Sequence, residues 1–264
     1  MDLGVDRIAE AADLLVAARH SGAKLPGLPD AIRPRNIEDA YRIQDAVLSR
    51  LGEGSSGWFM ACTGAAMQKI HGLPGPYFGR MLASAVFDSP ARLVMKGAER
   101  WSLEIELVFR MGRDLPSRAT PYGVSEVEAS IGAMHPGLEL VEGRYDDMTK
   151  VDGPTLVADN GTDGLLVLGP AFEDWRALDR TKIDVMLFKN GRAEVEGSGA
   201  LVMGDPLNAL VWLANELSRR GLGLRAGETV NTGNCLARYC YGASGDSVVA
   251  ECGALGRARA ELVS

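Results

Sequence analysis

The chain has 264 residues, of which 46% are hydrophobic and 24% are charged, and its formal net charge is −7. These proportions are those of a globular protein, and the length fits one large domain or a core domain with a small appendage. The acidic balance and the lack of a dense Lys/Arg block argue against a nucleic-acid surface. No apolar run reaches the roughly 18 residues of a membrane helix, so we expect no membrane partner.

The first part of the chain has the periodicity of helices. An amphipathic helix is predicted over residues 5–20, without the basic start and long apolar core of a signal peptide. A second helix is predicted over residues 37–51, with Asn36 as its N-cap. A loop rich in Pro and Gly separates them. We therefore expect an N-terminal helical segment, residues 1–55, ahead of a β-rich body, residues 56–264.

The body alternates short apolar runs with Gly-rich turns, which is typical of β-strands. Asn190-Gly191 lies between two such runs and predicts a type I′ hairpin. Propensity alone therefore indicates an α+β fold with substantial β-structure.

Two helices are expected to interrupt the strands. Ser125 and Glu128 have capping-box spacing ahead of an apolar face that extends to Ile131 and Met134. Asp205-Pro206 has the signature of a helix start, with proline in the first turn.

The cysteines carry information about the redox compartment. The chain has four of them, with no CxxC pair and no histidine at metal-site spacing. We interpret them as free thiols of a reducing compartment and expect a cytoplasmic protein.

Two carboxylates share one face of a predicted strand, WSLEIELVF at residues 101–109. Glu104 and Glu106 are two residues apart, about 7 Å along that face, and Glu139 lies in a second apolar run, HPGLELVEGR. Alternating glutamates are typical of a solvated outer face. If the three instead converge, their repulsion requires a cation, and an oxygen-only ligand set suits Mg²⁺ or Mn²⁺. Spacing alone leaves both interpretations open.

Several motifs in a fixed order favour one of these two interpretations of the glutamates. E-x-E is followed about 33 residues later by H-P-x-x-E-x-x-x-x-R, and other segments read AYRIQDAV, GLPGPYFGRML, VADNGTDGLLVLG, GDPLNALVWLANEL, TVNTGN and GALGRARAEL. From about residue 37 to the C-terminus, the chain resembles the 2-keto-4-pentenoate hydratase/4-oxalocrotonate decarboxylase family of the fumarylacetoacetate hydrolase superfamily.

The resemblance implies a fold and a site. The fold is a mixed β-sheet roll with a small N-terminal helical segment, usually assembled as homo-oligomers of dimers or higher. Glu104, Glu106 and Glu139 match the family's ligands for Mg²⁺ or Mn²⁺. Thr232 and Gly233 match the segment that helps to hold the substrate's carboxylate end. The implied partner is a small-molecule 2-oxo or 2-hydroxydienoic acid.

The chain departs from the family pattern beside the substrate. Phe59 stands where the family has a lysine, and Ser84 aligns loosely with a family aspartate. Phenylalanine cannot bind an anion or carry a proton. With Trp58 and Met60 it could line an apolar substrate pocket, or it could simply fill space. Thr162 retains a hydroxyl in the segment that resembles A-D-N-A-S-S.

Hydration of a dienol needs a proton shuttle, and the sequence offers several candidates. Arg144 follows Glu139 at the family's spacing and could pair with an anionic substrate. Arg80 is a second cationic candidate and is assigned to substrate binding. Lys69 and His71 are further candidates for the shuttle, although His71 is at a predicted helix end, where a surface residue is expected. His135 could act in catalysis or support the strand that carries Glu139.

The resemblance therefore predicts a hydratase-like lyase that acts on a 2-hydroxy-2,4-dienoate or 2-oxo acid through a metal-stabilised enolate. A decarboxylase, or an isomerase or tautomerase of a 2-oxo acid, remains an alternative because Phe59 replaces the lysine. A binding subunit that has lost catalysis is the alternative outside the enzymes.

Overall fold

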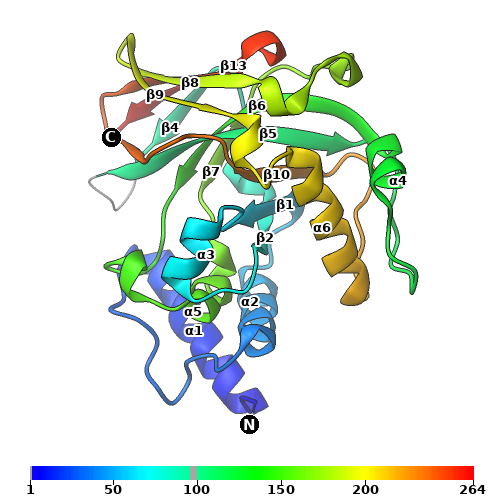
Figure 1. Cartoon of the computed structure of the whole chain (residues 1–264). Coiled ribbons are helices and arrows are strands. Elements are labelled where there is room, and N and C mark those ends of the chain that lie inside the picture. The colour runs from blue at the N-terminus through cyan, green and yellow to red at the C-terminus, as the bar shows by residue number, and fades with distance from the viewer. Residues whose placement is uncertain (1, 96–99) are drawn as a thin grey trace.

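The computed structural model describes residues 2–95 and 100–264 (Figure 1). Its helices are α1 (Val5–Ser21), α2 (Ile37–Leu51), α3 (Ala65–His71), α4 (Val124–Ala129), α5 (Gly153–Ala158) and α6 (Pro206–Arg219). Its strands are β1 (Ser55–Ala61), β2 (Tyr77–Leu82), β3 (Val86–Asp88), β4 (Ala91–Val94), β5 (Trp101–Met111), β6 (Ile131–Val141), β7 (Leu165–Leu168), β8 (Asp184–Lys189), β9 (Arg192–Ser198), β10 (Thr229–Asn234), β11 (Cys240–Gly242), β12 (Ser247–Glu251) and β13 (Arg257–Val263). Among the described residues, no helix combines the length and apolar character needed to cross a membrane.

The strands form two sheets of mixed direction. The larger has the order β2-β1-β10-β5-β6-β7-β3, with β11 also paired to β5, and the smaller has the order β4-β13-β12-β8-β9. The pairs β1·β10, β3·β7 and β4·β13 are parallel, whereas β5 and β6 form a long antiparallel pair. The predicted α+β fold with a mixed sheet is confirmed.

The N-terminal helices pack together at one end of the molecule. Helix α1 contacts α2, and α2 contacts α5 of the body (Figure 1). Helix α2 begins as the sequence predicts, because the Asn36 side chain accepts a hydrogen bond from the Asp39 N–H at 2.8 Å. The first strand then begins at Ser55, so the polypeptide passes from helix to sheet within four residues of Leu51.

Two other local predictions are confirmed. Asp205 caps α6 by accepting from the Leu207 N–H at 2.8 Å, with Pro206 in the first turn. Asn190 and Gly191 both have positive φ, 53° and 76°, as a type I′ hairpin between β8 and β9 requires.

The helix predicted from Ser125 is wrong in its start and its length. Helix α4 is capped at Gly123, whose N–H donates to the Glu126 carboxylate at 3.0 Å, and it ends at Ala129. Ile131 and Met134 belong to β6, because pairing with β5 offers these apolar side chains a larger buried surface than a free helix end.

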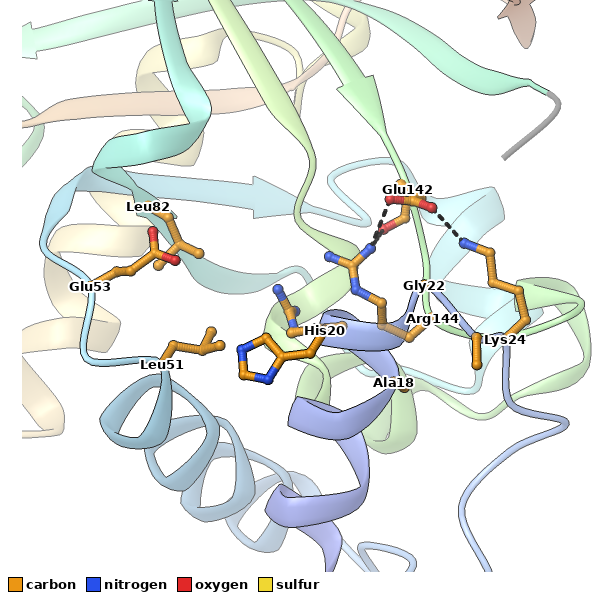
Figure 2. Close-up of a pocket in the computed structure, with 11 residues that line it drawn as sticks. Ala18, His20, Gly22, Lys24, Leu51, Glu53, Leu82, Glu142 and Arg144 are labelled. Atoms are coloured by element: carbon orange, nitrogen blue, oxygen red, sulfur yellow. Dashed lines mark hydrogen bonds and ion pairs between the residues drawn. The ribbon is translucent and has the colours of Figure 1, made fainter. Parts of the chain in front are cut away.

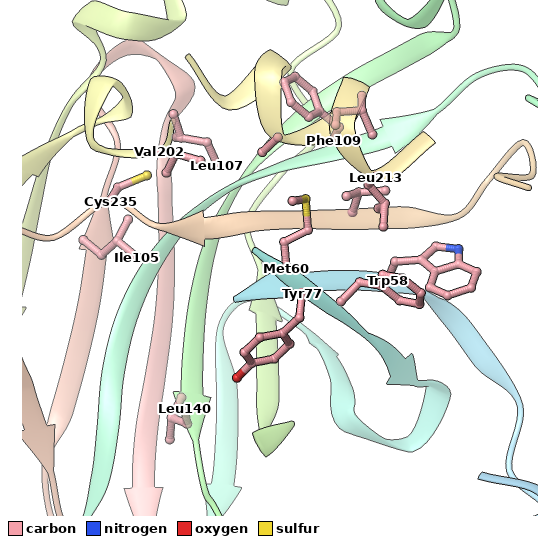
Figure 3. Close-up of a cluster of buried hydrophobic side chains, with 14 of the residues drawn as sticks. Trp58, Met60, Tyr77, Ile105, Leu107, Phe109, Leu140, Val202, Leu213 and Cys235 are labelled. Atoms are coloured by element: carbon pink, nitrogen blue, oxygen red, sulfur yellow. The ribbon is translucent and has the colours of Figure 1, made fainter. Parts of the chain in front are cut away.

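The core lies between α6, the larger sheet and the smaller sheet. On β5, alternate residues Leu103, Ile105, Leu107 and Phe109 are completely buried on this side (Figure 3). Strand β1 contributes Trp58 and Met60 to the same core. The cysteines are free thiols, as predicted, and three of them are buried: Cys235, Cys240 and Cys252.

A buried ion-pair network ties α1 to the body. Arg19 Nη2 lies 2.6 Å from Asp163 Oδ1 and 3.1 Å from Asp159 Oδ1, and all three side chains are at most 8% exposed. The same guanidinium nitrogen donates to the Asp159 carbonyl at 2.7 Å. Since these two aspartates flank the turn at residues 160–162, α1 fixes the position of that turn.

Removal of the Arg19 guanidinium is expected to destabilise the fold. Arg19→Ala leaves the buried Asp159 carboxylate without its ion pair and Asp163 with Arg144 alone, which should lower the free energy of unfolding by about 3–5 kcal/mol in urea denaturation. The control is Arg7→Ala on the same helix, because the Arg7–Glu10 pair is more than half exposed. Its change should stay within about 0.5 kcal/mol. Equal effects of the two substitutions would contradict the role of the network.

Candidate functional site

Antiparallel pairing of β5 and β6 brings three glutamates together. Glu104 pairs directly with Glu139, and Glu106 pairs with Gly137. Directly paired residues and residues two apart share one face of a sheet, which we call the site face. A carboxylate oxygen from each of the three glutamates lies within 4.8 Å of the others.

The glutamates are not a solvated row. Glu106 is 1% exposed and Glu139 is 4% exposed, while Glu104 is partly exposed at the open side of the cluster. A Cβ at position 137 would lie 2.7 Å from Val108 Cγ2 and 3.1 Å from Glu106 Cβ. Glycine therefore suits the position opposite Glu106, because a larger residue would force the Val108 side chain to shift and would crowd Glu106.

Burial and mutual repulsion oppose ionisation of the cluster. Burial raises the pKa of Glu104 to about 7. Burial and the Glu104 charge raise the pKa of Glu139 to about 8, and burial and the Glu139 charge raise the pKa of Glu106 well above its usual range. Glu106 Oε1 is also buried without a hydrogen-bond partner among the described residues. A hard divalent cation fits this oxygen-only set, since it would offset the repulsion and bind the unpartnered oxygen.

The Thr-Gly segment of β10 supports the cluster from the other side of β5. The Gly233 N–H donates to Glu106 Oε2 at 2.6 Å, and the Thr232 hydroxyl donates to the Leu107 carbonyl at 2.7 Å. Gly233 has φ of 115°, and a Cβ there would lie 2.2 Å from Thr63 Oγ1. Both residues therefore bond to β5. Gly233 orients the Glu106 carboxylate, and Thr232 binds the backbone next to it.

Phe59 lies on the site face, whereas Trp58 and Met60 do not. Phe59 pairs with Asn231 of β10 and with Gly79 of β2, and it is 3% exposed. Trp58 and Met60 point into the core, so the idea that all three line one pocket is wrong: successive strand residues face opposite sides. The Phe59 ring packs in a small apolar cluster, together with Met81, Leu82, Ala85, Val108 and Leu166.

Thr162 belongs to a strained turn on the same side. Asn160, Gly161 and Thr162 all have positive φ, which is uncommon for residues with a Cβ. The Asn160 amide bonds the backbone of Arg80 in both directions, at 2.8 and 2.9 Å, and the Tyr77 hydroxyl donates to the Gly161 carbonyl at 3.2 Å. These contacts hold the Thr162 turn against β2, with Tyr77 beneath it.

Arg144 lies outside the glutamate cluster. Its guanidinium contacts the Glu142 carboxylate at 3.3 Å and Asp163 at 3.3 Å, and it lines a separate cavity of about 230 Å³ at the end of α1 (Figure 2). Lys24 and His20 line the same cavity, and Lys24 also pairs with Glu142. The structure therefore joins Arg144 to the ion-pair network of Arg19.

Arg80 and Ser84 also contact other groups. Arg80 pairs with Trp58 across the strands, on the face opposite the glutamates, and its guanidinium stacks 3.5 Å above the Trp58 ring. It lines a cavity of about 440 Å³ beside Arg225. Ser84 is exposed and donates a hydrogen bond to the Glu53 carboxylate.

His135 lies on the site face but at a different position along β6. It pairs with Val108, four residues from Glu139, and its Nδ1 lies 2.9 Å from the Gly169 carbonyl. Burial lowers its pKa, and Nε2 has no hydrogen-bond partner among the described residues. This arrangement ties β6 to the residue that follows β7.

Two site-face residues were missed by sequence reasoning. Tyr77 lies under the Thr162 turn, and Asn231 lies between Phe59 and Val108 in the sheet register. Asn231 had a signal that could have been used, because it is an amide within TVNTGN, one of the segments that resemble the family. Tyr77 had none, because an aromatic residue in a strand is ordinarily a core residue.

Comparison with known proteins agrees with the geometry. Residues 65–263 match the family model described as fumarylacetoacetate (FAA) hydrolase C-terminal. The chain therefore belongs to the fumarylacetoacetate hydrolase superfamily.

Individual relatives narrow the family. The chain is 33% identical over 227 residues to a 2-keto-4-pentenoate hydratase of Paraburkholderia xenovorans, which covers 85% of this chain and 83% of that protein. It is 31% identical to a 2-hydroxyhexa-2,4-dienoate hydratase of Comamonas testosteroni, with 88% of each chain covered. The fold is similar to 4-oxalocrotonate decarboxylase from Pseudomonas putida G7, with a TM-score of 0.90, 23% identity and 99% of both chains covered. Within the superfamily, the chain belongs to the 2-keto-4-pentenoate hydratase/4-oxalocrotonate decarboxylase family, as its motifs indicated.

The raised pKa values predict a pH-dependent stability in the absence of divalent cations. An unfolded glutamate titrates near 4.5, whereas Glu104 and Glu139 titrate at about 7 and about 8 in the fold. Because the folded state binds these protons more tightly, the stabilisation is complete below the unfolded pKa and is lost as the pH rises through the folded values. In EDTA, the free energy of unfolding should therefore fall between about pH 5 and pH 8.

Glutamine substitution separates this effect from other titrations. Glu139→Gln cannot ionise at this position. Urea denaturation at several pH values should therefore show that its free energy of unfolding falls less steeply with pH than that of the wild type. Glu261→Gln, on an exposed residue of β13, should keep the wild-type slope. Equal slopes for the wild type and Glu139→Gln would contradict the assignment.

Proposed function

We propose that this protein is a divalent-metal-dependent hydratase that acts on a 2-hydroxy-2,4-dienoate or the related 2-oxo acid. The observation that carries the proposal is the convergence of Glu104, Glu106 and Glu139 on one buried face. The relatives named as hydratases support the reaction class. Fold neighbours described with magnesium and adipate, and with Mn²⁺ and pyruvate, support Mg²⁺ or Mn²⁺ and a carboxylic acid ligand.

Different residues of the site have different roles in this proposal. The three glutamates hold the cation, and Gly233 fixes the orientation of Glu106 through its N–H. The chemistry supplied by a bound divalent cation is stabilisation of the negative charge that develops when a 2-oxo acid enolises. The apolar cluster around Phe59 excludes water from one side of the site, which strengthens electrostatic interactions there.

Tyr77 and Thr162 are the hydroxyl groups that we assign to proton handling. Burial raises the pKa of Tyr77 well above its usual range, so its hydroxyl stays protonated, and it donates to the Gly161 carbonyl at 3.2 Å. Thr162 and the charge of Glu104 both act on the pKa of this hydroxyl. Three of the candidates from the sequence take no direct part in this proposal, because other groups engage their side chains. Arg144 contacts Glu142 and Asp163, Arg80 stacks on Trp58, and Ser84 donates to Glu53.

Isomerisation of a 2-oxo acid is the second candidate. It needs the same enolate but no added water, and the apolar side chain of Phe59 beside the site favours a proton shift over water addition. Decarboxylation is compatible with the fold similarity alone.

The reaction is tested with 2-hydroxypenta-2,4-dienoate and Mg²⁺. We expect its ultraviolet absorbance to decrease and the product to gain the mass of one water molecule. A product of unchanged mass would assign the isomerase. Decarboxylation needs a second carboxylate whose loss as CO₂ leaves the dienolate, so it is tested separately with 2-oxohex-3-enedioate, and a product that has lost CO₂ would assign the decarboxylase.

The metal requirement is tested separately. EDTA should abolish turnover and Mg²⁺ or Mn²⁺ should restore it, because the cation supplies several kcal/mol of charge stabilisation. Glu104→Gln should lower kcat/KM by about 10²-fold or more. The control Glu261→Gln should behave as the wild type. Turnover that is unaffected by EDTA and by Glu104→Gln contradicts the proposal.

A further inference from the structure

Asn231 is a buried amide without regular hydrogen bonds. Its side chain is completely inaccessible to solvent, and neither Oδ1 nor Nδ2 makes a hydrogen bond of normal geometry to a described residue. Leaving a buried polar group without a hydrogen-bond partner destabilises the folded state. Asn231, with two such atoms, is therefore unfavourable for the stability of β10, whereas its neighbour Val230 is an ordinary core residue.

The position of Asn231 points to the reason. It pairs with Val108 of β5, two residues from Glu106 on the same face, and with Phe59 of β1. Phe59 and Val108 have no polar side-chain atoms, so the amide has no partner in its own pairs. Gly137, opposite Glu106, carries no side chain, and the Glu106 and Val108 side chains occupy the space above it.

The partner within reach is the Glu139 carboxylate. Asn231 makes no hydrogen bond of normal geometry to Glu139, but it lies close enough for its amide, as a donor, to lower the pKa of Glu139 against the larger opposing effects of burial and of Glu104. Asn231 lies on the same strand that donates the Gly233 N–H to Glu106. Strand β10 therefore faces two of the three carboxylates, once through its backbone and once through a side chain.

We propose that Asn231 is a positioning residue of the metal site, whose Nδ2 holds Glu139 in its cation-binding orientation. The inference rests on the proposed function, because it requires the glutamates to hold a cation. A carboxylate that binds a metal ion is normally oriented by a further hydrogen bond, and loss of such a partner lowers metal affinity by about 10–100-fold. The Asn231 amide becomes satisfied when the site is loaded, which accounts for its retention in an otherwise apolar pair.

The test measures Mn²⁺ binding, by electron paramagnetic resonance and by calorimetry, without any substrate. Asn231→Leu keeps a similar volume but removes the donor, and we expect about 10–100-fold weaker Mn²⁺ binding. Thr229→Val is the matched control, because Thr229 lies on the same strand, is also buried, and also has an unpartnered hydroxyl. It pairs with Gly57 and Arg110, away from the glutamates, so its affinity should equal that of the wild type.

Thermal unfolding in EDTA separates positioning from support of the fold. Removal of an unsatisfied amide in favour of an apolar side chain should leave the Tm of the metal-free protein unchanged or raise it. The increase in Tm caused by Mn²⁺ should be smaller for Asn231→Leu than for the wild type. A metal-free Tm that falls by several degrees would assign Asn231 to the fold and overturn the inference.

The two proposals fail in different ways. Wild-type affinity in Asn231→Leu overturns the role of Asn231 and leaves the proposed function intact. If the wild type itself binds no Mn²⁺, and Glu139→Gln is indistinguishable from it, the metal site fails and the positioning role fails with it.

Discussion

The structure depends on the burial of three carboxylates that repel one another. Glu104, Glu106 and Glu139 meet because β5 and β6 pair in a register that places residue 104 opposite residue 139. A shift of one residue would turn both glutamates of β5 into the core and their apolar neighbours outward. The same register places Leu103, Ile105 and Leu107 in the core, so packing on one face holds the charged groups on the other. The hydrophobic core thus fixes an arrangement that electrostatics alone would disperse.

Around this cluster, each neighbouring strand makes a different contribution. Strand β6 places Gly137 against the Glu106 and Val108 side chains, and β10 supplies the Gly233 N–H and carries Asn231 on the same face. Strand β1 contributes only the apolar ring of Phe59. The half of the site that contains the glutamates is therefore rich in polar contacts, whereas the side where the family has a lysine is apolar. This asymmetry is why our proposal assigns proton handling to hydroxyl groups of β2 and the adjacent turn.

The N-terminal helices belong to the same system. Arg19 of α1 binds both aspartates that flank the turn bearing Thr162, and Asn160 ties that turn to β2. Arg144, which sequence spacing had indicated as a substrate contact, shares Asp163 with Arg19. An arginine that the motif associates with substrate is therefore engaged in this structure in holding the turn. The helical segment and the site are linked through charges that are buried together.

The sequence by itself determined the elements and the composition of the site. Periodicity and capping residues located α1, α2 and α6, the Asn190-Gly191 dipeptide located a hairpin, and the order of motifs indicated the family. These are local signals, and they need only near neighbours in the chain. The helix from Ser125 was wrong because a partner strand, distant in the sequence, decided the conformation of the apolar residues that follow Ala129.

Only the tertiary structure decided which candidates meet. Whether Glu139 joins Glu104 and Glu106 depends on a register between strands separated by a long loop, and spacing along the chain carries no information about register. Arg80 and Phe59 are on adjacent strands and were equal candidates, yet the alternation of β1 and β2 turns Arg80 to the face opposite the glutamates and Phe59 toward them. Asn231 gained its significance only when its pairing partners proved to be apolar and a carboxylate lay within its reach.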